Sequence, residues 1–309
     1  MKIFALCNSD QLGLPAVAKL KELNLLIGVS FIERYRKDLV PSFTALGIED
    51  DQLFPLQKDN WELSLEKTLL KLKPDCVFVL TFPWKIPGDL LKLPPKGFVN
   101  FHYALLPKYK GADPIFWQIK NNEKEGGITV HIMNSELDEG PIILQEKIPF
   151  PGGFNYGIYC GQLSQANETW VSKVVTKLMA KEPEFITMEP VEKPAPLTKP
   201  EPADLRIDWL NQTALEIEAL TNATNPRYGG ADTTFSGQLI KILEVTPIDG
   251  NDTMKGAPGE IVYSDLTYGP IVACINEELL RITVAHVGGA YMSGVKLTTL
   301  GFFKGASFL

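Results

Sequence analysis

The sequence has few residues with which to bind a metal or form disulfide bonds. Of its 309 residues only three are histidine and four are cysteine, and the cysteines follow no paired spacing. Scattered cysteines of this kind are typical of small core residues in a reducing compartment, not of a disulfide framework or a zinc site. We therefore expect a cytoplasmic protein without a metal centre.

The sequence also lacks an excess of positive charge and any long apolar run. Its formal net charge is -7. This excludes a positive charge spread over the whole chain for nucleic-acid binding, but it does not exclude a local basic patch. No apolar stretch reaches the roughly 18 residues of a membrane span, and residues 1–7 are typical of a strand rather than of a secretory signal. With 45% hydrophobic residues, the composition is that of a globular protein large enough for two domains.

Strand and helix patterns alternate through the first part of the chain. Short apolar runs at 76–80 and 98–101 predict buried strands, and the amphipathic stretches 14–23, 61–72 and 156–181 predict helices. This alternation favours an α/β fold with an open, mostly parallel, Rossmann-like sheet.

The composition changes near residue 190. Residues 190–202 read PVEKPAPLTKPEP, which is typical of a stiff, extended linker. After it the sequence predicts one helix over 203–223 and then short strands separated by Gly, Pro and Asn, which favour a small OB-like β-barrel. We predict a catalytic domain at 1–189, a linker at 190–203 and a barrel domain at 204–309.

Three polar side chains have the chemistry of acyl transfer to an amine. Asn100 and His102 are two residues apart at the end of a predicted strand, so both face the crevice at the carboxyl edge of the sheet. Asp138 lies in a turn between two later predicted strands. The Asn100 amide would stabilise the developing oxyanion by about 3–4 kcal/mol. His102 would take the proton of the amine, and Asp138 would orient the ring or pass the proton on.

Each of these residues alone also has a structural interpretation, because Asn and Asp are common turn formers and buried histidines are common structural groups. Their setting narrows the choice. The stretch 100–111, NFHYALLPKYKG, is similar to the signature of the folate-dependent formyltransferases, which reads Asn-x-His-x-Ser-Leu-Leu-Pro and then basic, aromatic, basic and Gly. The segments 127–129 and 137–141 resemble the Gly-Val-Thr and Leu-Asp-x-Gly segments of that family. The resemblance implies a formyltransferase with Asn100, His102 and Asp138 as its catalytic residues.

The resemblance also implies the donor and its binding site. The co-substrate would be 10-formyltetrahydrofolate, and the stretch 81–87, TFPWKIP, is similar to the family segment whose backbone cradles the pteridine ring. Phe82 and Trp84 would be apolar walls of the folate pocket, or alternatively would close the edge of the core. The predicted folate contacts are Phe82, Trp84, Lys85, Ile86, Pro87, Leu137, Glu139 and Gly140. One departure from the motif is Ala104, where the family usually has serine.

The acceptor amine stays open. The segments 196–199, 206–209, 257–261 and 301–305 resemble the C-terminal part of methionyl-tRNA formyltransferases, which favours Met-tRNA by architecture. The basic stretch 31–37, however, lacks the longer insertion that those enzymes use on tRNA. Tyr109 lies between two cations and can stack on a nucleic-acid base. Trp117 is a bulky residue on a predicted helix and can line a narrow acceptor pocket. The predicted acceptor contacts are Lys108, Tyr109, Lys110, Gly111 and Trp117.

Other activities compete with this prediction. The acceptor can be an amino-sugar nucleotide or a natural-product amine, and the same three side chains serve hydrolases of formyltetrahydrofolate. A nicotinamide oxidoreductase is disfavoured because residues 7–13, CNSDQLG, contain no Gly-x-Gly-x-x-Gly turn. The expected partners are the folate co-substrate and the acceptor amine, with no membrane. The oligomeric state cannot be predicted.

Overall fold

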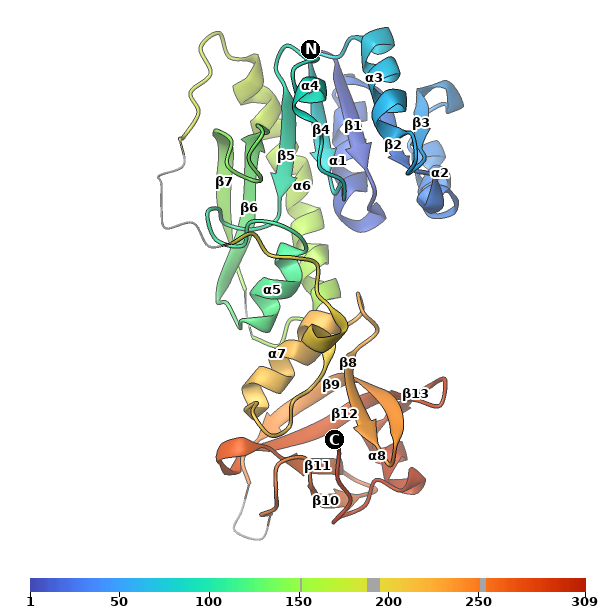
Figure 1. The fold of residues 1–309 in the computed structure, drawn as a ribbon, viewed down its shortest axis with the longest axis vertical. Helices are drawn as coiled ribbons and strands as arrows, with labels where there is room; N and C mark the ends of the chain where they lie inside the picture. The colour runs from blue at the N-terminus through green and yellow to red at the C-terminus, as the bar shows by residue number, and fades with distance from the viewer. Residues whose placement is uncertain (151, 188–194, 251–253) are drawn as a thin grey trace. The chain divides into compact units, whose positions relative to one another are not determined.

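A computed structural model describes residues 1–150, 152–187, 195–250 and 254–309. The chain divides into two compact units, each assembled from segments distant in the sequence (Figure 1). The first contains Met1–Pro114, Glu125–Pro149 and Cys160–Thr198, and the second contains the remaining segments, Ile115–Lys124, Phe150–Tyr159 and Lys199–Leu309. Residues 190–194 of the predicted linker lie outside the described residues.

The first unit is built on a seven-stranded, mostly parallel sheet in the order β3-β2-β1-β4-β5-β6-β7 (Figure 1). Strands β1 to β5 are parallel to one another, whereas β6 pairs antiparallel with both β5 and β7. The central strands β1 and β4 are buried along their whole length, as expected for strands covered on both faces. This sheet confirms the predicted α/β class. The strands are β1 (Ile3–Cys7), β2 (Leu26–Ile32), β3 (Leu53–Leu56), β4 (Cys76–Leu80), β5 (Phe98–His102), β6 (Glu125–Ile132) and β7 (Ile142–Pro149).

Helices connect the parallel strands. Helix α1 begins where the Ser9 hydroxyl accepts a hydrogen bond from the Leu12 N–H at 3.0 Å, and the helix packs on β1, β2 and β4. Helix α3 ends at Lys73, whose left-handed backbone (φ 50°) stops the helix before Pro74. The helices whose residues lie wholly or largely in this unit are α1 (Asp10–Glu22), α2 (Arg36–Ala45), α3 (Trp61–Leu72), α4 (Gly88–Leu91) and α6 (Tyr156–Met179).

The second unit is an antiparallel sheet in the order β10-β11-β12-β9-β8, with β13 paired to β12. The last residues of the chain join its two edges. Phe308 bridges Phe235 of β8, and Ser307 bridges Glu260 beside β10. This closure confirms the predicted small barrel. The elements are α5 (Pro114–Lys120), whose first residue belongs to the other unit, α7 (Ala214–Thr224), β8 (Ala231–Phe235), β9 (Gln238–Ile248), β10 (Ile261–Asp265), β11 (Gly269–Ala273), β12 (Leu279–Val287), β13 (Ala290–Ser293) and α8 (Gly294–Leu297).

The predicted helix over 203–223 is wrong in its first half. Pro202–Leu205 forms a short 3-10 turn, and Arg206 then bridges Asp232 as extended chain. Helix α7 starts only after Thr213, whose side chain and that of Glu216 form a reciprocal capping box. Within the part of the chain that the structure describes, no helix is long and apolar enough to cross a membrane.

Candidate active site

The structure brings Asn100, His102 and Asp138 together. Asn100 and His102 lie on β5, and Asp138 lies in the loop between β6 and β7, two strands of the same sheet. The Asn100 Nδ2 group donates to Asp138 Oδ1 at 3.3 Å, and His102 Nδ1 lies 3.6 Å from Asp138 Oδ2. His102 and Asp138 are buried, whereas Asn100 is half-buried. The carboxylate therefore lies between the amide and the imidazole.

The hydrogen bond of His102 Nε2 assigns the tautomer of the ring. Nε2 lies 2.9 Å from the carbonyl oxygen of Tyr109, and because a carbonyl only accepts, Nε2 carries the hydrogen. In the neutral ring Nδ1 is then unprotonated, and it faces Asp138. Burial lowers the pKa of His102 below its ordinary 6.5, although the charge of Asp138 opposes this shift. Near pH 7 His102 is therefore a neutral imidazole whose Nδ1 is able to accept a proton.

Asp138 is ionised in spite of its burial. Burial alone raises the pKa of this carboxyl, but the neighbouring His102 and His131 and the Gly111 N–H outweigh it and lower the pKa to about 2. The Gly111 N–H donates to Oδ2 at 2.9 Å. The Asp138 backbone is left-handed (φ 54°), a conformation that aspartate tolerates better than most residues. At neutral pH a fixed negative charge thus stands beside a neutral imidazole.

His131 is a fourth member of the cluster that sequence reasoning missed. It lies opposite Asn100 in the β5–β6 register and is almost fully buried. Its Nε2 lies 3.2 Å from Asn100 Nδ2 and 3.5 Å from Asp138 Oδ1, and its Nδ1 lies 3.3 Å from the Ile132 carbonyl. If Nδ1 carries the hydrogen, Nε2 accepts from Asn100; if Nε2 carries it, His131 donates to Asp138. The proton position on His131 therefore decides how many N–H groups of Asn100 are free.

The turn after His102 is held without a serine hydroxyl at position 104. The Thr129 hydroxyl donates to the Ala104 carbonyl at 2.7 Å and accepts from the Leu106 N–H at 3.0 Å. The Gln145 amide donates to Thr129 Oγ1 at 2.9 Å and to the Leu106 carbonyl at 2.8 Å. Support of the turn thus comes from β6 and β7.

The predicted acceptor contacts occupy different environments. Lys108 is exposed, whereas the Lys110 ammonium is buried and lies 2.9 Å from Glu139 Oε1. Tyr109 is left-handed (φ 57°), which turns its carbonyl toward His102. Gly111 contacts Asp138 through its N–H. Trp117 is half-buried on α5 of the second unit. The loop 108–111 therefore contacts the three catalytic candidates mainly through its backbone.

The first predicted folate segment follows β4 and is partly anchored in the core. The rings of Phe82 and Trp84 pack edge-on against each other (5.5 Å between centroids) and both contact Trp61 of α3. Ile86 is buried in the same core cluster. Lys85 is exposed, and Pro87 precedes the first turn of α4. Phe82 and Trp84 are half-buried, so each presents part of its ring to the surface.

The second predicted folate segment surrounds Asp138. Leu137 is 44% exposed, and the Glu139 carboxylate pairs with Lys110. A Cβ on Gly140 would lie 1.6 Å from the Ile132 carbonyl oxygen, so only glycine allows this close approach of the two chains. The glycine thereby keeps the 138–140 loop against β6.

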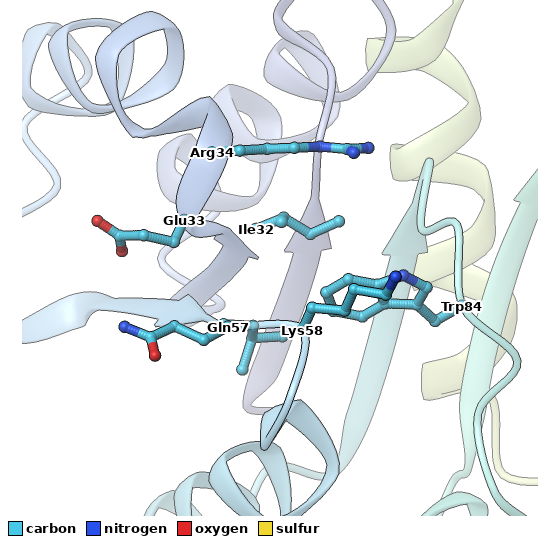
Figure 2. Close-up of a pocket in the computed structure, with 7 residues that line it drawn as sticks. Ile32, Glu33, Arg34, Gln57, Lys58 and Trp84 are labelled. Atoms are coloured by element: carbon cyan, nitrogen blue, oxygen red, sulfur yellow. The ribbon is translucent and has the colours of Figure 1, made fainter.

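A cavity of about 340 Å³ opens in the first unit beside Trp84. It is lined by Trp84 from the loop after β4 and by the last residues of β2 and β3 with those that follow them, namely Ile32, Glu33, Arg34, Leu56, Gln57 and Lys58. Figure 2 shows the side chains of Glu33 and Gln57 pointing away from the Trp84 ring, whereas Lys58 extends to the side on which Trp84 lies. The Glu33 carboxylate pairs with Arg36, so the cavity keeps a cationic and aromatic character. The three catalytic candidates do not line it.

No group of three or more His, Cys, Asp or Glu side chains with metal-site geometry occurs among the residues that the structure describes. The four cysteines are unpaired and buried.

Comparison with known proteins agrees with this fold. The sequence matches the family described as formyl transferase over residues 45–175 and the formyl transferase C-terminal domain over residues 199–299. A methionyl-tRNA formyltransferase of Alkaliphilus oremlandii is 34% identical over 228 residues, which cover 73% of this chain and 70% of that protein. A methionyl-tRNA formyltransferase of Pseudomonas fluorescens Pf-5 is 31% identical over 258 residues, covering 81% and 76%.

Solved structures show the same fold at lower identity. HypX from Aquifex aeolicus, crystallised with tetrahydrofolic acid, superposes with a TM-score of 0.68 at 16% identity; the match covers 97% of this chain and 47% of HypX. This chain thus spans about half the length of that protein. Phosphoribosylglycinamide formyltransferase from Bacillus halodurans gives a TM-score of 0.51 at 20% identity over 59% of this chain and 96% of that enzyme. The fold and the sequence matches define a formyl-transferring enzyme. The chain belongs to the formyl transferase family.

Proposed function

We propose that this enzyme transfers the formyl group of 10-formyltetrahydrofolate directly to an amine, with Asn100, His102 and Asp138 as its catalytic residues. The observation that carries the proposal is the position of His102 Nδ1, an unprotonated nitrogen 3.6 Å from an ionised carboxylate and fixed by the bond of Nε2 to Tyr109. This arrangement suits a base that must hold a proton briefly. We keep the domain division at 1–189, 190–203 and 204–309 as part of the proposal.

The proposed reaction balances without a protein nucleophile. The lone pair of the amine attacks the formyl carbon, a new C–N bond forms, and the carbonyl oxygen becomes an oxyanion. His102 Nδ1 takes the proton released by the nitrogen, and Asp138 stabilises the resulting imidazolium. The bond between the formyl carbon and N10 of the folate then breaks, and N10 receives the proton. The products are the N-formyl acceptor and tetrahydrofolate.

Asn100 can support the oxyanion only if one of its N–H groups is free. Its amide nitrogen lies 3.3 Å from Asp138 Oδ1 and 3.2 Å from His131 Nε2, which engages both hydrogens when His131 accepts. With the hydrogen on His131 Nε2, that ring donates to Asp138 instead, and the Asn100 N–H that His131 would otherwise accept is available to the substrate. A donor of this kind lowers the barrier by about 3–4 kcal/mol. We assign the second arrangement to the reacting enzyme.

The cavity beside Trp84 supports binding of the folate tail. Folate ends in glutamate carboxylates, and the cavity combines an indole wall with the cations Arg34 and Lys58. Among residues 1–150, 152–187, 195–250 and 254–309, no carboxylate lies within ion-pair distance of Lys58. An ammonium in this position attracts an anionic ligand without first breaking an internal pair.

Lys58→Ala is expected to raise the KM for 10-formyltetrahydrofolate by about 1.5-fold to fivefold, since an exposed ion pair contributes roughly 0.2–1 kcal/mol. The kcat should stay unchanged, and the effect should grow with the number of glutamates and shrink with added salt. Lys71→Ala, which removes an exposed lysine on α3, is the matched control. Steady-state kinetics with mono- and triglutamate donors make the measurement. An equal KM in both variants would contradict binding of the folate tail in this cavity.

We propose Met-tRNA as the acceptor because the Alkaliphilus oremlandii and Pseudomonas fluorescens relatives, at 34% and 31% identity, are methionyl-tRNA formyltransferases. One observation favours a smaller acceptor. Residues Glu33–Tyr35 form a 3-10 turn that leads directly into α2 at Arg36, so this position holds no inserted basic loop. An amino-sugar nucleotide or a natural-product amine is therefore the second candidate.

The deciding experiment supplies 10-formyltetrahydrofolate with Met-tRNA, amino-sugar nucleotides or aminoacyl carriers and identifies the products by mass spectrometry. Formyl-Met-tRNA is the expected product. Formylation of a sugar nucleotide or carrier alone would replace the acceptor and keep the chemistry. Free formate with every acceptor would show a hydrolase, and no consumption of the donor would overturn the proposed function.

A further inference from the structure

The chain segment just before the second unit, residues 195–198, lies along the loop that contacts the catalytic side chains. The Leu197 N–H donates to the Lys110 carbonyl at 2.8 Å, and the Leu197 carbonyl accepts from the Ala112 N–H at 2.9 Å. These two bonds make a parallel bridge between Leu197 and Gly111 within the first unit. Part of the stretch predicted as a linker is therefore docked as extended chain on the 109–112 loop.

Gly111 is adapted to this contact. Its φ is 102°, and a Cβ at this position would lie 2.2 Å from the Leu197 carbonyl oxygen and 2.7 Å from the Leu197 nitrogen. No side chain fits in that space, so the two backbones approach each other as closely as glycine permits. The glycine of the sequence motif thus has a partner well over 80 residues away in the sequence.

The same loop holds two catalytic side chains from its other side. The Tyr109 carbonyl accepts from His102 Nε2 at 2.9 Å, and the Gly111 N–H donates to Asp138 Oδ2 at 2.9 Å. Between them, Lys110 pairs with Glu139 next to Asp138. A displacement of the loop therefore moves the support of the base and of the carboxylate at the same time. Leu197 is the residue that contacts this loop from the opposite edge.

We propose that Leu197 is a positioning residue, whose backbone clamps the 109–112 loop and keeps His102 and Asp138 in their reactive geometry. The inference rests on the proposed role of those two residues. Its physical reason is that small displacements of catalytic groups cost large factors in rate, whereas donor binding on the sheet edge does not depend on this contact. The segment that contains Leu197 then belongs structurally to the catalytic unit.

The test removes the Leu197 N–H and keeps the rest of the chain. Leu197→Pro deletes the donor to Lys110, and Leu197→Ala keeps both backbone bonds and shortens only the half-buried side chain. Leu197→Pro should lower kcat by on the order of tenfold to a hundredfold with the KM for 10-formyltetrahydrofolate within about twofold of wild type. Leu197→Ala should retain the wild-type kcat. The acid limb of the rate profile should move to lower pH in the proline variant, because His102 loses part of the raising effect of Asp138 on its pKa.

A second variant keeps the test valid if Leu197→Pro does not fold. Replacing Leu197 by its α-hydroxy acid in the full chain turns the amide into an ester, which removes the same N–H without a ring. Circular dichroism and thermal melts verify the fold of each protein. Equal kcat values and pH profiles in the folded Leu197 variants would overturn the inference, as would a rise in KM alone. If Asp138→Asn is also fully active, the proposed function fails instead.

Discussion

Replacing Asp138 with asparagine should lower kcat about a thousandfold or more and leave the fold intact. The substitution keeps the shape of the side chain, and the remaining carbonyl oxygen can still accept the Gly111 N–H. It removes the negative charge that lies 3.6 Å from His102 Nδ1. Without that charge the imidazolium formed by proton transfer is buried and unpaired, which is costly in a site that excludes water.

The measurement compares purified wild type, Asp138→Asn and Glu136→Gln in the formyl-transfer assay. Glu136 is an exposed carboxylate of the same loop, so its amide variant changes the loop charge without touching the cluster. Thermal melting verifies that both variants are folded. A near-normal kcat in folded Asp138→Asn would contradict the role given to this residue, whatever the acceptor.

The catalytic candidates were accessible to sequence reasoning because the motif is local and its chemistry is specific. Asn100 and His102 are two residues apart on one strand, and Asp138 lies in a turn that glycine and proline mark clearly. His131 gave no such signal. It sits within an apolar strand pattern, and its role depends on the pairing of β5 with β6. The alternation of Thr129 and His131 on β6 is the signal that would have placed both on the face of the cluster.

The burial of individual side chains was harder to predict than their membership of a candidate site. Lys110 is predicted from the sequence as a contact of the acceptor, yet its ammonium is buried against Glu139. Ile86 reads as part of a ligand-binding loop, yet it packs into the core. In both cases the deciding partner comes from a segment distant in the sequence, which neither charge pattern nor periodicity records.

The fold class could be predicted from the sequence, but helix α2 and the closure of the barrel could not. The alternation of apolar runs and amphipathic stretches is strong in β4 and α3, whose predicted bounds agree with those of the structure. Helix α2 buries only Leu39 and Phe43 and contains Pro41, so its pattern is too weak to predict. The barrel closes through residues 307–308 at the end of the chain, a long-range pairing that local pattern cannot specify.

His102→Ala is the second variant with a large expected effect, a loss of kcat of about a hundredfold to ten-thousandfold, the range that general base catalysis contributes. The truncation leaves space where the ring lay between Tyr109 and Asp138. Added imidazole should therefore restore part of the rate in the alanine variant. Pyrrole, which has no basic nitrogen, is the matched control and should restore none.

The pH profile separates a base from a structural histidine. A general base acts in its neutral form, so if His102 has the proposed role, kcat/KM should fall as the pH drops through the pKa of His102 and stay level above it. Burial lowers that pKa, which puts the midpoint of the acid limb below 6.5. In Asp138→Asn the residual activity should show a still lower midpoint, because the carboxylate charge that raises the His102 pKa is gone. An acid limb that is the same in both proteins would assign the titration to another group and remove His102 Nδ1 as the proton acceptor.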